Sequence, residues 1–518
     1  MNEHPIPATP SSVPTPPNGG MPPIQQSPKT VYSTSEQILA LLCLLLGFAF
    51  VRLVLFQSPG IGVVLFAAAF LGVSIGFYKK NRITFTPKAL LLLTLSGLFA
   101  VPFMLFADEV ILRPLLLVWI VCTALFTNEA VGIRTGDLMQ QSLRALFGIP
   151  FKSFGRGASA IGQLVKKLPA QKTLTKILIG LAVALPVTAL VLVLLVSADQ
   201  IFSDMIDGVQ KFLSNLILKD LLLFIRDLFF GCPIFFYLFG LLDGSLHYQR
   251  PVPLPIELKK STVLQRVSPL TLCVAATPLL LVYLAFFCAQ APYYFAAFSA
   301  YLPEGFTVSA FARRGFFELC VVSFINFAVL LALQLLSTKR EDKKTPVCIR
   351  VYSTLLSVFT LLLIATAMRK MLLYIDSFGL TKLRVLTCWA MLLLAACFIL
   401  IALYQLINHL PVKRWITGVC VAFIAILSFA NVDGMIAKYN VTAYQNGDLA
   451  TMDITHLYSL SADAVPYTIP LLQDKDPNVV DSTKQYLKAW DKKLDKCDFP
   501  EYSLSILRAR HALKDAGM

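Results

Sequence analysis

The chain has 518 residues, of which 57% are hydrophobic and 14% are charged. A soluble chain of this length needs more charged side chains on its surface, so the composition excludes a cytosolic enzyme and indicates an all-α, polytopic membrane protein. The net charge of +15 is compatible with binding to nucleic acid, with binding to anionic lipid, or with basic cytoplasmic loops of a membrane protein. The positions of the cations along the chain decide between these explanations.

Residues 1–34 form a proline-rich tail that holds nine of the 30 prolines. Such a segment cannot bury enough apolar surface to order itself, so we expect a disordered N-terminus. The spacing of Pro7 and Pro10 leaves open an extended ligand for a partner, and a solvated linker is the favoured interpretation.

Residues 35–430 form the predicted transmembrane domain. A bilayer core of about 30 Å needs about 20 apolar helical residues per crossing. Eleven runs meet this length: 37–56, 60–78, 89–106, 110–127, 176–197, 221–242, 268–289, 316–336, 347–368, 383–407 and 412–430. A further stretch, 291–302, is shorter and rich in aromatic residues, so we expect a re-entrant or interfacial segment there.

The charges of the loops predict the orientation, because Lys and Arg resist translocation. The loops after the even-numbered spans carry more positive charge than the net +15 of the chain, which predicts a cytoplasmic N-terminus and an extracytoplasmic C-terminus. One loop disagrees, because it places Lys370, Lys382 and Arg384 outside. Either a span is miscounted or protein groups hold these cations.

The cytoplasmic segment 136–170 alternates apolar residues with cations such as Arg144, Lys152 and Arg156. This basic amphipathic pattern is typical of a membrane surface, and we expect anionic lipid headgroups as its partner. Nucleic acid is the competing interpretation, and we expect no nucleic-acid partner because lipid lies adjacent.

Residues 431–518 are polar and predict a small extracytoplasmic helical domain with a possible protein partner. Asp463 is expected to cap a helix that carries Pro466 in its first turn. After an Asp-Pro turn, a second helix is predicted to bury Val479, Leu487 and Trp490, which recur with a period near 3.6.

Sequence motifs give little support to catalysis. Gly72-Val-Ser-Ile-Gly76 matches a nucleophile elbow, but it lies inside an apolar helix, where its glycines predict close helix packing instead. The five histidines are scattered along the chain, so we expect no metal centre and no cofactor.

Charged and polar residues within the spans form a candidate intramembrane site, since each is costly there unless it is paired. Arg226 and Asp227 point about 100° apart on one helix, so we expect each to find a partner on another span. Glu318 is four residues after Arg314, a spacing that favours a structural salt bridge. Asn326, in the same span as Glu318, completes the candidate site.

Pro186 and Pro278 lie in the middle of two spans that have the same predicted orientation. Each proline leaves a backbone carbonyl without its usual donor, so both are candidate helix breaks of the kind found in transporters. Prolines in ordinary membrane helices are the favoured alternative.

An elbow joins the ninth and tenth spans, and we treat it as a candidate anion-contact site. Gly379 is expected to stop the first helix with a left-handed conformation, and Thr381 is expected to cap the next helix. A tight hairpin with interfacial cations is the equally favoured alternative. The candidate residues are Arg369, Tyr374, Asp376, Gly379, Thr381 and Arg384.

This elbow and two later segments, Asn431 to Asn440 and Leu460 to Pro466, carry a resemblance to a known family. The chain resembles an uncharacterised bacterial polytopic membrane family with an Arg-Met-x-Leu-Tyr…Gly-Leu-Thr-x-x-Arg elbow and an Asn-x-Asp-x-x-Ile-x-x-Tyr-Asn segment. Here Lys370 stands between Arg369 and Met371. The likeness covers roughly residues 175–472. It implies a bacterial cell-membrane protein and brings no activity, because the family is known only as a domain of unknown function.

Two functions remain open. The first is a non-catalytic sensor, scaffold or envelope-associated interaction protein, favoured by a polar helical domain without a catalytic motif. The second is a secondary transporter that uses the polar groups of the membrane core. The sequence names no substrate for either.

Overall fold

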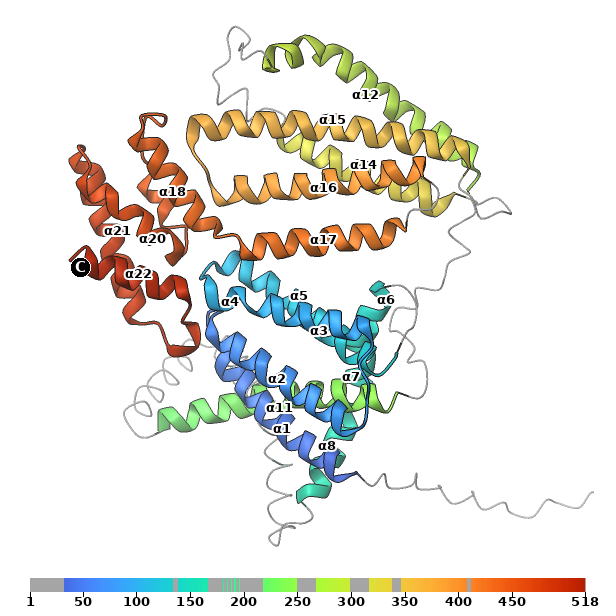
Figure 1. The fold of residues 1–518 in the computed structure, drawn as a ribbon, viewed down its shortest axis with the longest axis vertical. Coiled ribbons are helices and arrows are strands. Elements are labelled where there is room, and N and C mark those ends of the chain that lie inside the picture. The colour runs from blue at the N-terminus through green and yellow to red at the C-terminus, as the bar shows by residue number, and fades with distance from the viewer. Residues whose placement is uncertain are drawn as a thin grey trace, which may run out of the picture.

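The computed structural model is all-helical and confirms a polytopic membrane protein (Figure 1). It describes residues 32–133, 138–165, 218–248, 267–298, 316–337, 346–407 and 411–517, with Gly180, Ala184, Thr188, Val191 and Leu195. Ten helices in these ranges are long and apolar enough to cross a membrane. The predicted span 176–197, with Pro186, and the tail up to residue 31 lie outside the ranges described continuously.

Helices from the first half of the chain pack into a first bundle around an aromatic core that includes Phe70, Phe99 and Trp119. Its members are α1 (Thr34–Phe50), with η1 (Val51–Leu55), α2 (Ile61–Lys80), α3 (Pro87–Ala100), α4 (Pro102–Leu105), α5 (Glu109–Ala130) and α11 (Leu218–Leu246). A capping box of Ser33 and Glu36 begins α1, so this helix starts at the predicted end of the tail.

The close approach of α1 and α11 depends on glycine. A Cβ atom on Gly47 would lie 2.5 Å from the carbonyl oxygen of Gly231, so a larger residue would push the two helices apart. The glycines that were predicted to pack closely, Gly72 and Gly76, have no described atom within 4 Å of such a Cβ. That prediction is wrong because α2 turns this face away from the other described helices.

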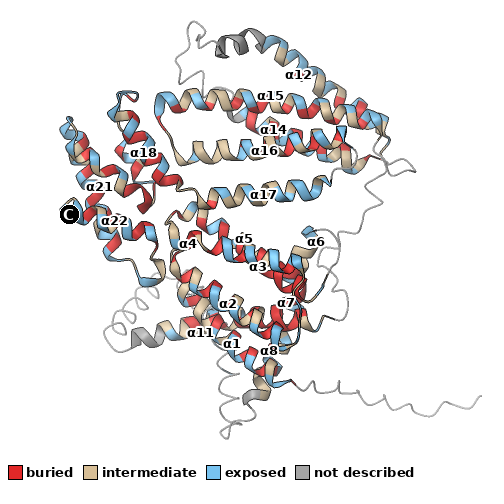
Figure 2. Ribbon diagram, in the orientation of Figure 1, coloured by how far each residue is buried: buried red, intermediate tan, exposed pale blue. Residues whose placement is uncertain are grey.

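A second bundle consists of α12 (Pro269–Phe298), α14 (Phe316–Leu336), α15 (Val347–Phe378) and α16 (Lys382–Leu406). Figure 1 shows α17 (Val412–Phe429) between the two bundles. Ile424 of α17 packs on the first core and Ile416 on the second. Most of α17 is only partly buried or exposed (Figure 2).

Two predictions about the region of α12 are corrected. The helix runs without interruption through Pro278, so the predicted break is absent there. Residues 291–298 extend the same helix instead of forming a separate re-entrant segment, and residues 299–302 lie outside the described chain.

The described part of the basic segment folds as short helices across one end of the first bundle. These are α6 (Leu138–Leu143), η2 (Arg144–Gly148), α7 (Ile149–Lys152) and α8 (Phe154–Val165). The rings of Phe147 and Phe151 stack and remain exposed, while Ala145 and Ile149 are buried. The two faces give the segment the amphipathic character that its sequence predicts.

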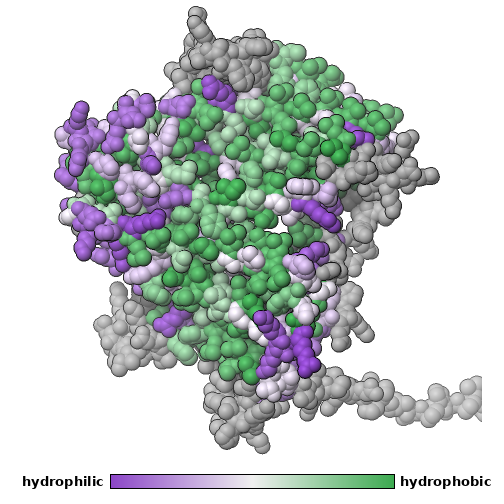
Figure 3. All heavy atoms as spheres, in the orientation of Figure 1, coloured by the Kyte–Doolittle hydropathy of each residue, from purple (hydrophilic) through white to green (hydrophobic). Residues whose placement is uncertain are grey.

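The residues after α17 form a C-terminal helical domain. Its elements are α18 (Val432–Gln445), α19 (Ile454–Leu457), η3 (Ala462–Ala464), α20 (Val465–Thr468), η4 (Ile469–Gln473), α21 (Pro477–Asp495), η5 (Phe499–Glu501) and α22 (Leu504–Asp515). The predicted buried face of α21 is present, with Val479, Leu487 and Trp490 in the core. Figure 3 shows hydrophilic side chains over this domain and hydrophobic ones over the bundles.

Pro466 lies in the first turn of α20, as predicted, but Asp463 is not the cap. Ser461 caps η3, because its hydroxyl accepts a hydrogen bond from the backbone N–H of Asp463. The carboxylate of Asp463 is thereby left for another contact, described below.

The C-terminal domain lies across one end of the membrane domain. The backbone N–H of Ile61 donates to the carbonyl oxygen of Tyr502, at 2.8 Å, and the N–H of Ala107 donates to Asp463, at 3.0 Å. Lys382 contacts the same domain. The loops before α2, before α5 and before α16 therefore meet at one end of the bundles.

Candidate functional site

The elbow between α15 and α16 is a tight hairpin. Gly379 is buried and has φ +73°, and the hydroxyl of Thr381 accepts a hydrogen bond from the N–H of Arg384, so both local predictions are confirmed. The guanidinium of Arg384 donates to the carbonyl oxygens of Phe378, at 3.1 Å, and of Gly379. It also lies 4.3 Å from the ring centroid of Tyr374. Arg384 therefore satisfies the free carbonyls at the end of α15.

The C-terminal domain binds this elbow through the side-chain amide of Asn440. The N–H of Leu380 donates to Oδ1 of Asn440, at 2.7 Å, and Nδ2 of Asn440 donates to the carbonyl oxygen of Leu380, at 2.8 Å. Two backbone groups that the turn leaves without partners are thus satisfied by α18.

Lys382 explains the loop that disagreed with the charge rule. Its Nζ donates to Asp108, at 3.0 Å, and to Asp433, at 2.8 Å. The same oxygen of Asp433 accepts the N–H of Ser461, at 2.8 Å. Protein carboxylates therefore hold this cation, and all three segments that carry the family resemblance meet at it.

A third carboxylate, Asp463, completes what we call the acidic junction: Asp108, Lys382, Asp433 and Asp463. Asp463 accepts hydrogen bonds from the hydroxyls of Ser461, at 3.0 Å, and of Ser505, as well as from Ala107. Burial raises the pKa of Asp463. Burial, and then the charge of Asp433, raise the pKa of Asp108 against the lowering effect of Lys382. Asp108 and Asp433 share one lysine, and no described ion pair joins Asp463 to a cation, which leaves the junction short of positive charge.

A cavity of about 400 Å³ opens beside the acidic junction, between the membrane helices and the C-terminal domain. Asp108 and Lys382 line it from the membrane side, and Tyr458, Trp490 and Lys493 line it from the C-terminal domain. Its volume falls in the range of small-molecule sites.

Not every predicted elbow residue belongs to this junction. Arg369 is partly buried along α15 and Asp376 is exposed on the last turns of that helix. Among the described residues, the hydrogen bonds and ion pairs around Lys382 include neither side chain.

The predicted intramembrane residues lie outside the junction: Arg226 and Asp227 are on α11, and Glu318 and Asn326 are on α14. Arg226 bonds its own neighbour Asp227, at 2.7 and 3.0 Å, and lies 4.6 Å from the ring centroid of Phe56. The expectation of a partner on another span is therefore met by Arg226, which faces Phe56, but not by Asp227, because the flexible arginine folds back to it across its own helix turn.

Asn326 belongs to the second bundle. Its Oδ1 accepts the hydroxyl of Tyr283, and its Nδ2 donates to Thr360, at 2.9 Å, so it joins α12, α14 and α15. Glu318 is exposed at the start of α14, and its predicted partner Arg314 lies outside the described residues. The polar groups thus act as separate helix contacts and do not form one site.

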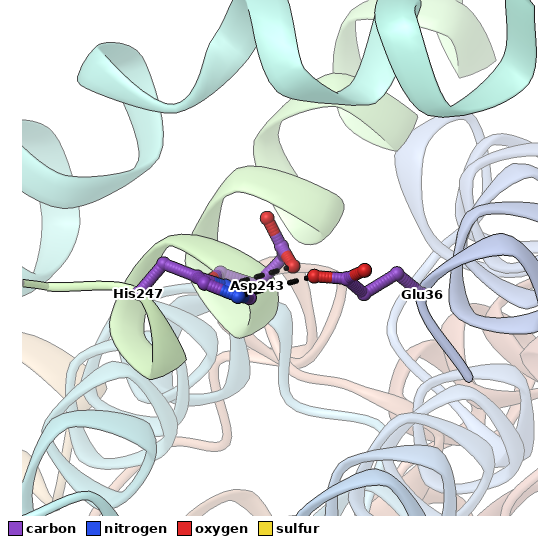
Figure 4. A group of neighbouring side chains, drawn as sticks. All are labelled: Glu36, Asp243 and His247. Carbon is purple, nitrogen blue, oxygen red and sulfur yellow. Dashed lines mark hydrogen bonds and ion pairs between the residues drawn. The ribbon is translucent and has the colours of Figure 1, made fainter. Parts of the chain in front are cut away.

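A second cluster, at the opposite end of the membrane domain, contains Glu36, Asp243 and His247 (Figure 4). The imidazole Nε2 lies 3.1 Å from Glu36, and Nδ1 lies 3.2 Å from Asp243. Arg156 of α8 bonds Asp243 at 2.6 Å and lies 3.5 Å from Glu36. The three ligand types can hold a metal ion, but the two nitrogens face different carboxylates and Arg156 already supplies a cation, so the geometry favours an ion-pair cluster.

Sequence reasoning missed this cluster and the carboxylate partners of Lys382. Asp243 and His247 are four residues apart on one helix, a signal that was readable. Glu36 and Asp108 carry no comparable local signal, because their pairing depends on contacts across more than 200 residues.

With ten described helices able to span a bilayer and a polar helical domain at one end, the chain is a multi-span helical membrane protein. It belongs to the family defined by the domain of unknown function DUF4153, whose profile matches residues 60–471. This range contains the elbow and both later segments, which confirms the resemblance. Comparisons with curated proteins and with solved structures find no match.

Proposed function

We propose that the protein is a non-catalytic sensor or scaffold of the bacterial cell membrane, in which the C-terminal domain passes an external binding event to the elbow of α15 and α16. One observation carries this proposal: the three segments of the family resemblance converge on Lys382, which ties Asp433 of that domain to the membrane helices. A joint of this kind couples the two domains, since a change at one side alters the charge balance of the other.

The proposed orientation places the C-terminal domain outside and the N-terminus in the cytoplasm. The end that carries Lys79, Lys80 and the basic segment lies opposite the acidic junction, as the charge rule requires. The exposed Lys152 and Phe151 of the basic segment favour anionic lipid as its partner.

Secondary transport is the alternative, and vesicle flux measurements address it. The observations that motivated it have weakened, because α12 is continuous at Pro278 and Arg226 pairs with Asp227. An ion-dependent flux of a solute in reconstituted vesicles would restore transport as the leading proposal.

The variant Lys382→Met tests the coupling. It leaves two buried carboxylates without their shared cation, so we expect faster hydrogen exchange in α18 and the elbow, at an unchanged membrane level. We also expect a strain with this variant to reproduce the phenotype of a strain that lacks the protein. Lys484→Met, at an exposed position of α21, is the matched control. A wild-type phenotype with a loosened junction would contradict the proposal.

A further inference from the structure

The cavity beside the acidic junction has a charged lining of two signs. Asp108 and Lys382 lie on the membrane side, Lys493 and Lys496 lie at the end of α21, and Glu109 and Glu501 complete the charged lining. Pro59 and Val110 add apolar surface from the ends of two membrane-spanning segments. A ligand that fills this space therefore meets the buried acid Asp108 at one side and the two lysines of α21 at the other.

The acidic side lacks a hydrogen-bond donor. Asp108 is 5% exposed, its Oδ1 accepts from Lys382 and from the N–H of Val110, and its Oδ2 has no hydrogen-bond partner among the described residues. A buried carboxylate oxygen without a donor is costly, and the raised pKa of Asp108 agrees with this deficit. Asp108 lines the cavity, so a ligand N–H would supply the missing bond once the carboxylate turns this buried oxygen toward it.

The donor on the ligand is better supplied by a primary ammonium than by a metal ion. Lys382 Nζ lies 3.0 Å from the same carboxylate and would repel a divalent cation. A quaternary ammonium carries charge but no N–H to donate. A primary ammonium supplies both a positive charge and an N–H, and its single charge is repelled by Lys382 less than a divalent cation would be.

The basic side provides two exposed lysines around an aromatic residue. Lys493 Nζ lies 4.4 Å from the ring centroid of Trp490, and Lys496 ends the same helix. Both ammonium groups are exposed, so an anionic group of a ligand can approach them without displacing a described carboxylate.

We propose that this cavity binds a small zwitterion that carries a primary ammonium, held by Asp108, and a phosphate, held by Lys493 and Lys496. This is the chemistry of ethanolamine phosphate, which is available as a lipid headgroup or as a free compound. The proposal rests on the sensor function proposed above and names the class of ligand that the sensor binds.

Calorimetry on the full chain in phosphatidylcholine nanodiscs tests it, with O-phosphoethanolamine as the probe. We expect saturable binding, and binding of phosphocholine that is about tenfold weaker or more, because phosphocholine cannot donate to Asp108. No binding of O-phosphoethanolamine, or equal binding of the two compounds, would overturn the proposal.

Two variants locate the site. Asp108→Asn keeps a good helix cap for α5 but removes the negative charge, so we expect at least about a tenfold loss of affinity. The double variant Lys493→Ala with Lys496→Ala tests the side of the cavity that is proposed to bind the phosphate. Both positions are exposed, so this variant is expected to fold and keeps the test available if Asp108→Asn does not fold. Lys484→Ala with Lys488→Ala, exposed on the same helix outside the cavity, is the control. Unchanged affinity in the Lys493 and Lys496 variant would contradict the assignment.

Nanodiscs that contain phosphatidylethanolamine separate the two sources of the ligand. Loss of soluble O-phosphoethanolamine binding in them supports the lipid headgroup as the occupant, and undiminished binding supports the free compound. If the protein binds O-phosphoethanolamine but the Lys382→Met strain has a wild-type phenotype, the binding site stands and the sensor function is refuted. If the protein does not bind O-phosphoethanolamine but the Lys382→Met strain has the phenotype of a strain that lacks the protein, the sensor function stands and this ligand is refuted.

Discussion

Both backbone polar groups of Leu380 form hydrogen bonds with the side chain of Asn440, so the elbow of the membrane domain and α18 are joined across 60 residues. Replacing Asn440 by Ala leaves a buried N–H and carbonyl without partners, and we expect a loss of roughly 2–4 kcal/mol of stability. Thermal unfolding of the purified protein measures this loss. Asn446→Ala, at the exposed end of α18, is expected to change little.

Gly379 occupies a conformation, φ +73° and ψ −179°, that is essentially restricted to glycine. A Cβ atom there would also lie 2.6 Å from Oδ1 of Asn440. We expect Gly379→Ala to destabilise the protein by about 2 kcal/mol or more, as measured by its thermal unfolding midpoint. Gly447→Ala, at φ +84° with no atom within 4 Å, incurs the conformational cost alone. An equal effect of the two variants would contradict the steric part of the argument.

His247 predicts a pH dependence of the opposite end of the protein. Its hydrogen bond with Asp243 raises the pKa of the imidazole, against the effect of burial. Because the folded state favours the protonated form, the stabilisation is complete below the unfolded pKa of about 6.5 and is lost as the pH rises through the higher folded-state pKa.

We therefore expect the difference in unfolding midpoint between the wild type and His247→Gln to be largest in mildly acidic buffer and to shrink in alkaline buffer. His511→Gln removes an exposed histidine beside Asp515 and serves as the control. A difference that grows with pH would show that the neutral imidazole makes the contact.

The threading of the chain is testable with reporter fusions at Lys167 and at Met518. We expect signals from opposite sides of the membrane, with Lys167 in the cytoplasm, because the basic segment lies at the end opposite the C-terminal domain. A fusion at Asn81, in the short loop after α2, should agree with Lys167. Signals from the same side at Lys167 and Met518 would refute the proposed orientation.

Much of the fold could be predicted because a bilayer imposes a simple requirement on sequence. A run such as Leu39 to Val54 must be helical and long, whatever its partners are, since lipid offers no hydrogen bonds to the backbone. Local chemistry was equally readable at Gly379 and Thr381, where a glycine and a cap decide the turn. What failed was contact between helices: Gly72 and Gly76 match the Gly-x-x-x-Gly motif but meet no described neighbour, whereas Gly47, with Val51 four residues later, lies against α11.

The candidate site could be predicted only in part for the same reason. Lys382 was noticed because it broke the charge rule, but its partners Asp108 and Asp433 lie 274 and 51 residues away and carry no local mark of their pairing. Arg226 and Asp227 seemed to need distant partners because an ideal helix separates neighbouring side chains, whereas the long arginine side chain bends back.

The position of Asp433 and Asp463 in the chain bears on how the protein is assembled. Both residues are synthesised after the ten described spans, so Lys382 has no link to the C-terminal domain, and Ala107 lacks its carboxylate partner, until translation has passed the last of these helices. These contacts can therefore form only after the residues that follow α17 reach loops that were synthesised much earlier. A chain with a misplaced span would bring other loops to this place, so the contacts of Lys382 and Ala107 with the C-terminal domain would not form.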